Sequence, residues 1–284
     1  MHSHISLLTD YGTNDEFVGV MKSVITDMAP HVRITDLTHG VPAFDVRAGS
    51  LALARAIQYV PAGIVIAVVD PGVGSSRRAI AVEVAGGTGV LLGPDNGLLT
   101  SAAAMAGGAE RAFELTNVEL HLQAPGSTFA GRDVFAPVAA FLCNGGALED
   151  VGTEIDTASV MPGLVPIPTE TSHETYGVGV KCEVTWVDAF GNCQLNAGPE
   201  DLQAFGPILK LVIDDETRSA RIVTHFAEID GAIGAVIDSY GMIALAVDRG
   251  SASAELRLQA GDGVTIYAGN SDIPTSSVSL RAKQ

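Results

Sequence analysis

The chain has 284 residues, of which 47% are apolar and 32 are glycine, so it is long enough to bury one large core or two smaller ones. Its 33 acidic and 16 basic residues give a formal charge of −17, which leaves no basic surface for a phosphate backbone and excludes nucleic acid as a partner. The longest uninterrupted apolar stretch, residues 64–69, is far below the ~20 residues of a membrane-spanning helix, so no membrane partner is expected.

The cysteines and the N-terminal residues indicate the cellular compartment. Cys143, Cys182 and Cys193 are odd in number and lack CxxC spacing, which favours a reducing compartment and argues against a zinc site. Residues 1–4 lead directly into a predicted strand without a charged and apolar leader, so no secretory signal is expected. Both observations predict a cytoplasmic protein.

Short apolar runs alternate with longer amphipathic segments in the first half of the chain. The predicted strands span residues 5–9, 32–37, 64–69 and 79–84, and the predicted helices span residues 16–28, 45–59 and 97–106. Continuous apolar strands separated by segments of 3.6-residue period are typical of a sheet with helices on both faces. We therefore predict an N-terminal α/β domain over residues 1–165.

Residues 161–174 are the predicted linker, because their three prolines and their Ser and Thr residues disfavour both helix and strand. Beyond it, apolar and polar residues alternate in runs at 178–187, 208–213, 221–225, 235–237, 242–247 and 263–267. This pattern predicts a smaller C-terminal antiparallel β domain, either a sheet or a barrel, over residues 175–284. No internal repeat is evident.

The first candidate cluster, residues 8–15, lies where a buried strand is predicted to end and a helix to begin. Ligands of open α/β sheets bind at the carboxyl ends of the strands. A carboxylate there, such as Asp10, can accept hydrogen bonds from two vicinal hydroxyls, as a ribose presents them. The alternative is structural, with Asp15 capping the helix and Asp10 in a turn.

The second cluster, residues 68–78, also follows a predicted strand. Its glycines resemble a phosphate-binding loop, but the third glycine and the helix that should follow are missing, which excludes a dinucleotide-binding loop. Asp70 can instead pair with Arg77 or Arg78, with the spacing favouring Arg77, and such a pair can position a water molecule. The alternative is an ordinary Asp-Pro-Gly turn with a solvated arginine.

Three further clusters lie downstream. Residues 93–99 form a turn that is interpreted as the cap of the following helix. Residues 128–133 place the hydroxyl of Thr128 before an Arg-Asp pair that can start a helix or pair locally. In residues 187–192, Phe190 stands between polar side chains, so it can stack on a purine or lie in the core of a tight hairpin.

Together the five clusters resemble the S-adenosyl-L-methionine (SAM) hydrolases, also called hydroxide adenosyltransferases. The strings LLTDYGT, VVDPGVG, GPDNGLL, TF-x-GRD-x-FAP and VD-x-FGN occur in the order and near the separations of that family, from about residue 5 to residue 270. The related fluorinases and chlorinases share this layout with altered loops. The resemblance implies that water or hydroxide attacks C5′ of the ribose of SAM and releases adenosine and L-methionine, without a cofactor.

The resemblance also implies a water-handling set made of Asp70, Arg77 and a His, which this chain replaces with Ala130. General acid–base groups are typically worth ~10²–10⁴ in rate, so a weakened hydrolase with near-normal ligand affinity is expected. Members are typically homotrimers whose sites form between the first domain of one subunit and the second domain of its neighbour. SAM, adenosine and methionine are therefore the expected small-molecule partners.

Substrate contacts are implied by the same resemblance. Asp10 would bind the ribose hydroxyls, and Asp15 and Phe17 would line the methionine portion, with Asp188 at its ammonium and the Ser239–Tyr240 turn at its carboxylate. Phe190 and Asn192, with backbone groups near Asp248 and Arg249, would hold the adenine. Thr128 and Gly131 are further implied contacts.

Three positions separate this chain from the halogenases. Asp70 and Gly74 keep the hydrolase form of the loop, whereas the halogenases replace this aspartate. Gly131 lacks the Ser with which a fluorinase holds fluoride, so halide transfer is not favoured. Tyr240 stands where the halogenases carry Arg, so the carboxylate contact is expected to differ.

Two other functions compete with hydrolysis of SAM. A non-catalytic adenosine- or SAM-binding protein would account for Ala130 as lost chemistry. A metal-dependent hydrolase would rest on the oxygen-rich set Asp10, Asp36, Asp70, Asp95 and His39. Their spacing matches no standard metal cage, so no metal is expected.

Overall fold

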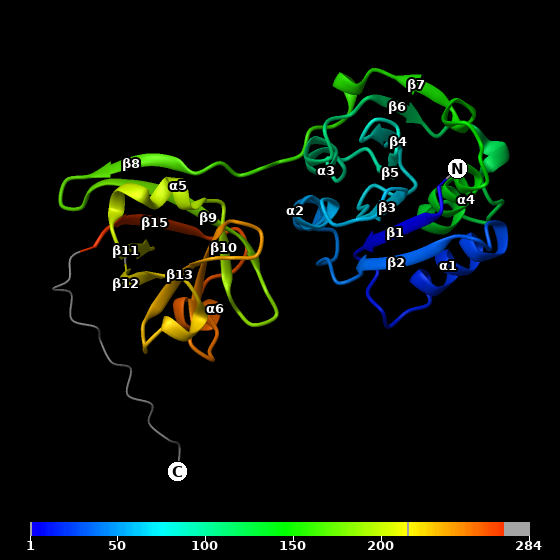
Figure 1. Cartoon of the computed structure of the whole chain (residues 1–284). Coiled ribbons are helices and arrows are strands. Elements are labelled where there is room, and N and C mark those ends of the chain that lie inside the picture. The colour runs from blue at the N-terminus through cyan, green and yellow to red at the C-terminus, as the bar shows by residue number, and fades with distance from the viewer. Residues whose placement is uncertain (1, 215, 270–284) are drawn as a thin grey trace, which may run out of the picture. The chain divides into compact units, whose positions relative to one another are not determined.

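The computed structural model describes residues 2–214 and 216–269. It consists of two compact units, Met1–Val165 and Pro166–Gln284, which we describe separately (Figure 1). The division between them falls inside the segment 161–174 that the sequence indicates as a linker. Residues 270–284, which belong to the predicted second domain, lie outside the described residues.

A seven-stranded mixed sheet forms the first unit, in the order β2-β1-β3-β5-β4-β6-β7. Its strands are β1 (His4–Thr9), β2 (Arg33–Thr38), β3 (Ile64–Val68), β4 (Ala79–Val84), β5 (Gly89–Pro94), β6 (Arg111–Glu114) and β7 (Thr153–Ile155). Strands β2, β1, β3 and β5 run parallel, and β4, β6 and β7 continue the sheet in antiparallel pairs. The four predicted strands are present, whereas β5, β6 and β7 have no counterpart among them.

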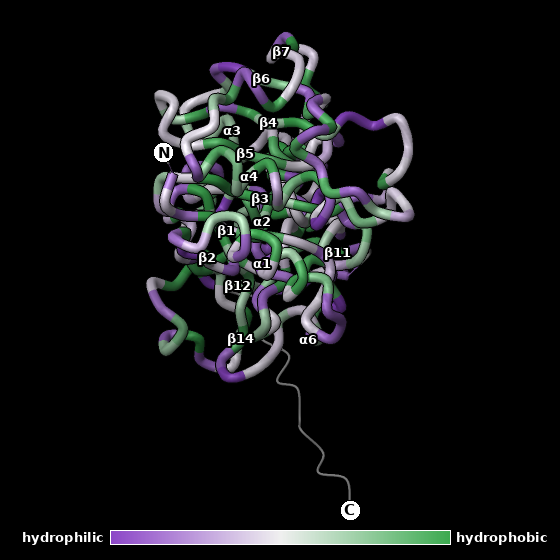
Figure 2. The backbone as a smooth tube through the Cα atoms, turned by 90° about the vertical axis from the view of Figure 1, so that its right-hand side faces the viewer, coloured by the Kyte–Doolittle hydropathy of each residue, from purple (hydrophilic) through white to green (hydrophobic). Residues whose placement is uncertain are grey.

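Helices cover both faces of this sheet, which confirms the predicted α/β class (Figure 1). Helices α1 (Phe17–Met28) and α4 (Ala136–Cys143) pack on one face, and α2 (Val46–Ile57) and α3 (Thr100–Met105) pack on the other. Successive residues of a strand point to opposite faces. The strands can therefore be apolar throughout, as Figure 2 shows for β3 and β5.

Residues 93–99, which were predicted to cap the following helix, instead comprise the end of β5 and a separate turn. Asn96 donates its side-chain amide to the carbonyl of Val69 at 2.9 Å and accepts from the amide of Leu98 at 3.2 Å. These bonds anchor residues 96–98 as a turn at the end of β3, so α3 begins only at Thr100, without a side-chain cap. The carboxylate of Asp95 is also used elsewhere, because it pairs with Arg78.

An eight-stranded sheet forms the second unit, in the order β10-β14-β13-β12-β11-β15-β9-β8. Its strands are β8 (Thr169–His173), β9 (Gly177–Val187), β10 (Cys193–Leu195), β11 (Ile208–Ile213), β12 (Glu216–Val223), β13 (Ile233–Ile237), β14 (Ile243–Val247) and β15 (Gly263–Ala268). An additional antiparallel pairing of β10 with β9 closes seven of them into a barrel, with β8 outside the ring. This confirms the predicted C-terminal β domain.

One pairing in the barrel departs from the antiparallel prediction. Strands β12 and β13 run parallel, with Ala220 opposite Ile233 and Val223 opposite Val236. The chain between them makes a crossover that includes a short helical turn at Phe226–Glu228, where a tight hairpin would have produced an antiparallel pair. The predicted strand at 221–225 is also displaced, because β12 spans Glu216–Val223.

The prediction that residues 161–174 contain no regular structure is wrong for their C-terminal part. Strand β8 begins immediately after Pro168, the last of the three prolines, and pairs antiparallel with β9 from Thr169 opposite Lys181 to His173 opposite Gly177. Its Thr residues are β-branched and suit an extended pairing. The part of the segment without regular structure therefore ends at Pro168.

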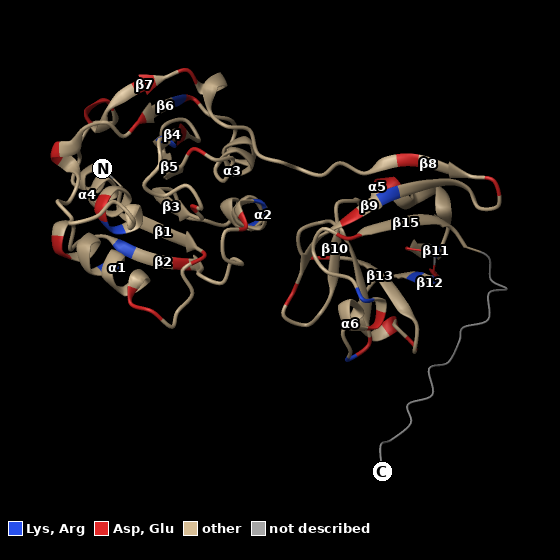
Figure 3. Ribbon diagram, turned by 180° about the vertical axis from the view of Figure 1, so that it is seen from behind, with Lys and Arg blue, Asp and Glu red and all other residues tan. Residues whose placement is uncertain are grey.

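The remaining elements are short. They are the helices α5 (Pro199–Leu202) and α6 (Ala252–Leu256), a π-helical turn at Gly131–Phe135, and 3₁₀ turns at Val118–Leu120, Leu148–Val151, Thr157–Ser159 and Gln203–Phe205. In the described part of the chain, no helix is both long and apolar enough to cross a bilayer. Figure 3 marks Asp and Glu residues in red along loops and strands of both units.

Candidate functional site

A pocket of about 260 Å³ lies in the first unit, at the carboxyl ends of β1 and β3. We call it the first-unit pocket; its lining comprises Asp10, Tyr11, Phe17, Ala43, Phe44, Asp70, Val73 and Thr128. Asp10 directly follows β1, and Asp70 lies two residues beyond β3. Because β1 and β3 pair in parallel, both carboxylates reach the same edge of the sheet.

Asp70 and Arg77 form a buried ion pair in this pocket. The Nε of Arg77 donates to Oδ1 and Oδ2 of Asp70 at 3.0 and 2.9 Å, and Nη2 also donates to Oδ2. The side chains are only 4% and 16% exposed. The guanidinium further lies 5.9 Å from the ring centroid of Phe135. These contacts hold a cation and an acceptor in fixed positions beside the pocket.

Arg78, the neighbouring arginine, points elsewhere. Its Nε donates to Oδ2 of Asp95 at 2.8 Å, and its guanidinium also donates to the carbonyl and the hydroxyl of Ser159. Neither Arg78 nor Asp95 lines the first-unit pocket. The two consecutive arginines therefore form two separate ion pairs, and only that of Arg77 includes a pocket carboxylate.

Asp10 is held by the segment that precedes α2. Its Oδ2 accepts the backbone amide of Phe44 at 2.9 Å, and Phe44 adopts a left-handed φ of 68° with its ring largely exposed. Among the described residues, no other hydrogen bond to the Asp10 carboxylate is found. Its second oxygen is therefore available to accept from a ligand hydroxyl.

Ala130 and Gly131 lie at the start of the π-helical turn that precedes α4. Ala130 is 8% exposed and belongs to the hydrophobic core of the first unit, and it precedes the π-helical turn at Gly131–Phe135. The following Arg132 pairs with its neighbour Asp133 through Nε at 2.6 Å, and its guanidinium lies 5.0 Å from the ring centroid of Phe129. Arg132 therefore stabilises the conformation of its own segment and does not line the pocket.

Neither of the two roles considered for Asp15 is found in the first unit, and the residues of the competing metal-dependent hydrolase are not grouped. Asp15 neither lines the pocket nor caps α1, because the N-cap residue is Glu16 and no side chain bonds there. Within residues 2–214 and 216–269, no three His, Cys, Asp or Glu side chains are grouped as a metal ion would require. His39 is instead engaged by the hydroxyl of Thr9 at 2.9 Å and by Asp36 at 3.1 Å.

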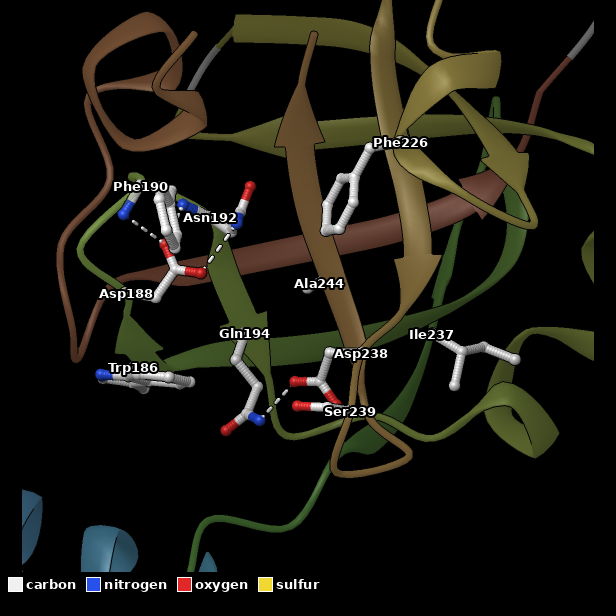
Figure 4. Close-up of a pocket in the computed structure, with 10 residues that line it drawn as sticks. All are labelled: Trp186, Asp188, Phe190, Asn192, Gln194, Phe226, Ile237, Asp238, Ser239 and Ala244. Atoms are coloured by element: carbon white, nitrogen blue, oxygen red, sulfur yellow. Dashed lines mark hydrogen bonds between the residues drawn. The ribbon is translucent and has the colours of Figure 1, made fainter. Parts of the chain in front are cut away.

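A second pocket, of about 280 Å³, lies in the second unit and is called the second-unit pocket (Figure 4). Its lining comprises Trp186, Asp188, Phe190, Asn192, Gln194, Phe226, Ile237, Asp238, Ser239 and Ala244. The pocket is formed largely by the β9–β10 and β13–β14 hairpins, which are adjacent because β10 pairs with β14. Predicted residues Asp188, Phe190, Asn192 and Ser239 thus come together here.

Phe190 is 80% exposed, so the prediction that it could lie in the core of a hairpin is wrong. The turn is held instead by Asp188, whose Oδ1 accepts the amides of Phe190 and Asn192, both at 2.9 Å, and whose Oδ2 accepts the side-chain amide of Asn192 at 2.7 Å. Loop hydrogen bonds therefore replace core packing, and the ring is left at the pocket surface.

The turn from Asp238 to Met242 repeats this geometry. Oδ1 of Asp238 accepts the amides of Tyr240 and Met242 at 2.8 and 3.0 Å, as Asp188 does in the first turn. Gly191 and Gly241, the fourth residues of the two turns, both have a φ of 83°. The two turns share the sequence pattern Asp-x-aromatic-Gly at residues 188–191 and 238–241, which accounts for their common geometry.

Gly191 and Gly241 differ in their surroundings, and this difference gives a stability prediction. A Cβ at Gly191 would lie 2.9 Å from Cα of Ser251, whereas one at Gly241 would meet nothing within 4 Å. We expect Gly241→Ala to cost about 1 kcal/mol for the left-handed conformation, and Gly191→Ala to cost about 1–3 kcal/mol more through overpacking. Urea unfolding followed by the fluorescence of Trp186, the chain's single tryptophan, measures both. Equal losses would contradict the steric argument.

Asp248 and Arg249 are not brought to either pocket. They lie just beyond β14, the guanidinium of Arg249 is 93% exposed, and its Nε is 3.9 Å from the Asp248 carboxylate. Tyr240 also lies outside the pocket lining, with its ring edge-on to Trp186 at 6.2 Å between centroids. Of the predicted Ser239–Tyr240 contact, only Ser239 lines the pocket.

Each of the two units matches a protein-family model. Residues 5–152 match the SAM hydroxide adenosyltransferase N-terminal domain, and residues 182–265 match the C-terminal domain of the same family. The chain belongs to this family.

Individual relatives of this family agree with that assignment. The chain is 41% identical over 265 residues to the (R)-S-adenosyl-L-methionine hydrolase of Salinispora tropica, covering 93% of this chain and 98% of the relative. It is 28% identical to a fluorinase of Actinoplanes, over 92% of this chain and 96% of the relative. A crystal structure of a conserved Thermotoga maritima protein superposes with a TM-score of 0.83 at 35% identity, over 93% and 99% of the two chains.

In this member of the family, the sequence analysis missed several pocket residues. Tyr11 and Phe44 line the first-unit pocket, and Trp186, Gln194 and Asp238 line the second. Tyr11 stands inside the LLTDYGT string directly after Asp10, so its position was a usable signal. Phe44 carries no such signal, because it reaches the pocket only through the fold of the segment before α2.

Proposed function

We propose that this chain hydrolyses SAM to adenosine and L-methionine. The observation that carries the proposal is that Asp10 and Asp70, the latter in a buried ion pair with Arg77, line one pocket at the carboxyl ends of β1 and β3. The family assignment and the 41% identity to a protein named (R)-S-adenosyl-L-methionine hydrolase support it. The reaction needs an in-line oxygen nucleophile about 3 Å from the carbon and a route for one proton.

In the proposed reaction, the oxygen of a water molecule forms a bond to C5′ of the ribose, and the bond between C5′ and the sulfonium sulfur breaks. The electron pair of that bond stays on sulfur, so methionine leaves as a neutral thioether and no general acid is required. Arg77 stabilises the developing hydroxide, and Asp70 orients the water and accepts its proton. Ala130 provides no side chain for either task, so turnover is slow.

Substrate binding is assigned to both pockets. Asp10 accepts the ribose hydroxyls, with Phe17, Thr128 and Gly131 beside the reacting centre. In the second unit, Phe190 and Asn192 take the adenine and Ser239 the carboxylate. Asp188 binds the methionine ammonium, since an ionised carboxylate has about four acceptor positions and its own loop uses three hydrogen bonds. No role is proposed for Asp15, Tyr240, Asp248 or Arg249.

We further infer a cytoplasmic homotrimer in which the first unit of one subunit and the second unit of its neighbour share the substrate. Exposed aromatic rings in both pockets, Phe44 and Phe190, support a site that is completed by another surface. The three free, buried cysteines support a reducing compartment; burial raises the pKa of Cys143 and Cys193 to about 11 and that of Cys182 to about 12, which keeps the thiols protonated.

The test measures adenosine and methionine released from each sulfonium epimer of SAM, separately, by chromatography. We expect slow release by the native chain and a rise in kcat of about tenfold for Ala130→His, because an imidazole adds an acid–base group but must fit into the packed core to which Ala130 belongs. Unchanged release in Ala130→His would show that the water site is not at position 130.

A non-catalytic adenosine- or SAM-binding protein is the second candidate, and the observation that favours it is Ala130 itself. Overnight incubation of the native chain with either epimer separates the two functions. Binding by calorimetry without adenosine above the buffer control would establish the binding protein. Release above that control, abolished in Asp70→Asn, would establish the hydrolase.

A further inference from the structure

Tyr11 lines the first-unit pocket together with the carboxylates of Asp10 and Asp70. Its ring packs against Phe17 and Phe129, with centroid separations of 5.5 and 5.7 Å. Its backbone amide donates to the hydroxyl of Thr9 at 3.1 Å, and Thr9 is in turn bonded to His39 at 2.9 Å. The ring is therefore fixed both by packing and through its backbone.

The hydroxyl of Tyr11 lies directly over Gly131. A Cβ added to Gly131 would stand 2.9 Å from the Tyr11 Oη and 3.2 Å from its Cε2. The phenol thus fills the space that any side chain at position 131 would take, including the Ser of a fluorinase. Gly131 directly follows Ala130, the position at which the family His is missing, and Tyr11 packs against the same hydrophobic cluster as Ala130.

The charges around this hydroxyl are those of the proposed reaction. Burial raises the pKa of Tyr11 above its ordinary value, and the negative charges of Asp10 and Asp70 raise it further, while the amide of Gly131 and the charge of Arg77 act in the opposite direction. The phenol therefore remains protonated at neutral pH, so it can both donate and accept a hydrogen bond but does not act as a base.

We propose that the Tyr11 hydroxyl holds the attacking water in this chain, in the role that the family assigns to the missing imidazole at position 130. The proposal rests on the proposed function. Tyr11 accepts one hydrogen bond from the water and leaves the second proton to Asp70, so it orients the nucleophile without being ionised. Such a water-holding group would let a chain with Ala130 hydrolyse SAM without the imidazole.

The test is a double-mutant cycle made of the native chain, Tyr11→Phe, Ala130→His and the double variant, with adenosine release from SAM as the readout. Tyr11→Phe retains the ring and its contacts with Phe17 and Phe129, and removes only the hydroxyl. We expect it to lower kcat about tenfold in the native chain with KM changed less than about twofold, because one hydrogen bond to the water is lost. In the Ala130→His chain, the same change should cost less than about twofold.

Tyr59→Phe is the matched control, because Tyr59 is an exposed tyrosine of the same unit that does not line the pocket. Equal kcat for the native chain and Tyr11→Phe, or an equal loss in both backgrounds, would overturn the inference while leaving the proposed function intact. If neither the native chain nor Ala130→His releases adenosine from either epimer, the proposed function fails, and the inference fails with it.

Discussion

Asp70→Asn is expected to lower kcat for adenosine release by about 10²–10⁴, the range that a general acid–base group supplies. The variant keeps the shape of the side chain but removes the charge that pairs with Arg77 and the group that accepts the water's proton. Because Asp70 is assigned to the chemical step, the affinity for adenosine should stay within about threefold. Single-turnover release of adenosine and calorimetric titration measure the two quantities.

Asp95→Asn is the matched control for this prediction. The Asp95 side chain is as buried as that of Asp70 and forms an ion pair with the adjacent arginine, Arg78, but Asp95 does not line the pocket. We expect it to lower the free energy of unfolding, since a buried guanidinium loses its partner, and to leave kcat within about twofold. Similar losses of kcat in the two variants would place the effect in stability and remove Asp70 from the chemistry.

Asp10→Ala is expected to weaken adenosine binding by about 10²–10⁴, because two hydrogen bonds to a charged acceptor are worth about 1.5–3 kcal/mol each. The structure adds a second effect, since the same carboxylate accepts the amide of Phe44. Loss of that bond would also release the segment before α2. Calorimetry with adenosine measures the combined loss.

Asp10→Asn separates the two effects. The amide oxygen of Asn can still accept from Phe44, whereas its NH₂ group cannot accept from a ribose hydroxyl. We therefore expect Asp10→Asn to lose at least about tenfold in adenosine affinity while keeping the thermal stability of the native chain. An unchanged affinity in Asp10→Asn would exclude the carboxylate from ribose recognition.

Apolar periodicity was sufficient to predict how the candidate carboxylates are placed. Residues 64–69 are apolar along their whole length, and residues 5–9 are apolar except for Ser6 and Thr9, which is the pattern of a parallel sheet buried on both faces. Parallel neighbours end at one edge, so Asp10 and Asp70 lie in the same pocket. Strands β5, β6 and β7 were missed because they are short or interrupted by glycine, and β6 and β7 pair with neighbours far along the chain.

Side-chain direction was decided by tertiary structure. Arg77 and Arg78 are identical in type and adjacent in sequence, yet one meets Asp70 and the other meets Asp95, because neighbouring residues of an extended segment point to opposite sides. Similarly, Phe190 could be read as a core residue until the hydrogen bonds of Asp188 fixed its turn and left the ring exposed.

The sequence by itself determined the family, the two kinds of domain and the identity of the polar residues at the ends of β1 and β3, because these follow from ordered motifs and local periodicity. Only the tertiary structure decided which arginine meets Asp70, that β12 and β13 run parallel, and that the hydroxyl of Tyr11 lies over Gly131 beside the missing imidazole. The approach of Tyr11 to Gly131 joins residues more than a hundred positions apart, so it exists only once the segment before α4 has packed on the sheet. The other two are closer in sequence, but they depend on how the Asp70–Arg77 loop and the β12–β13 crossover fold.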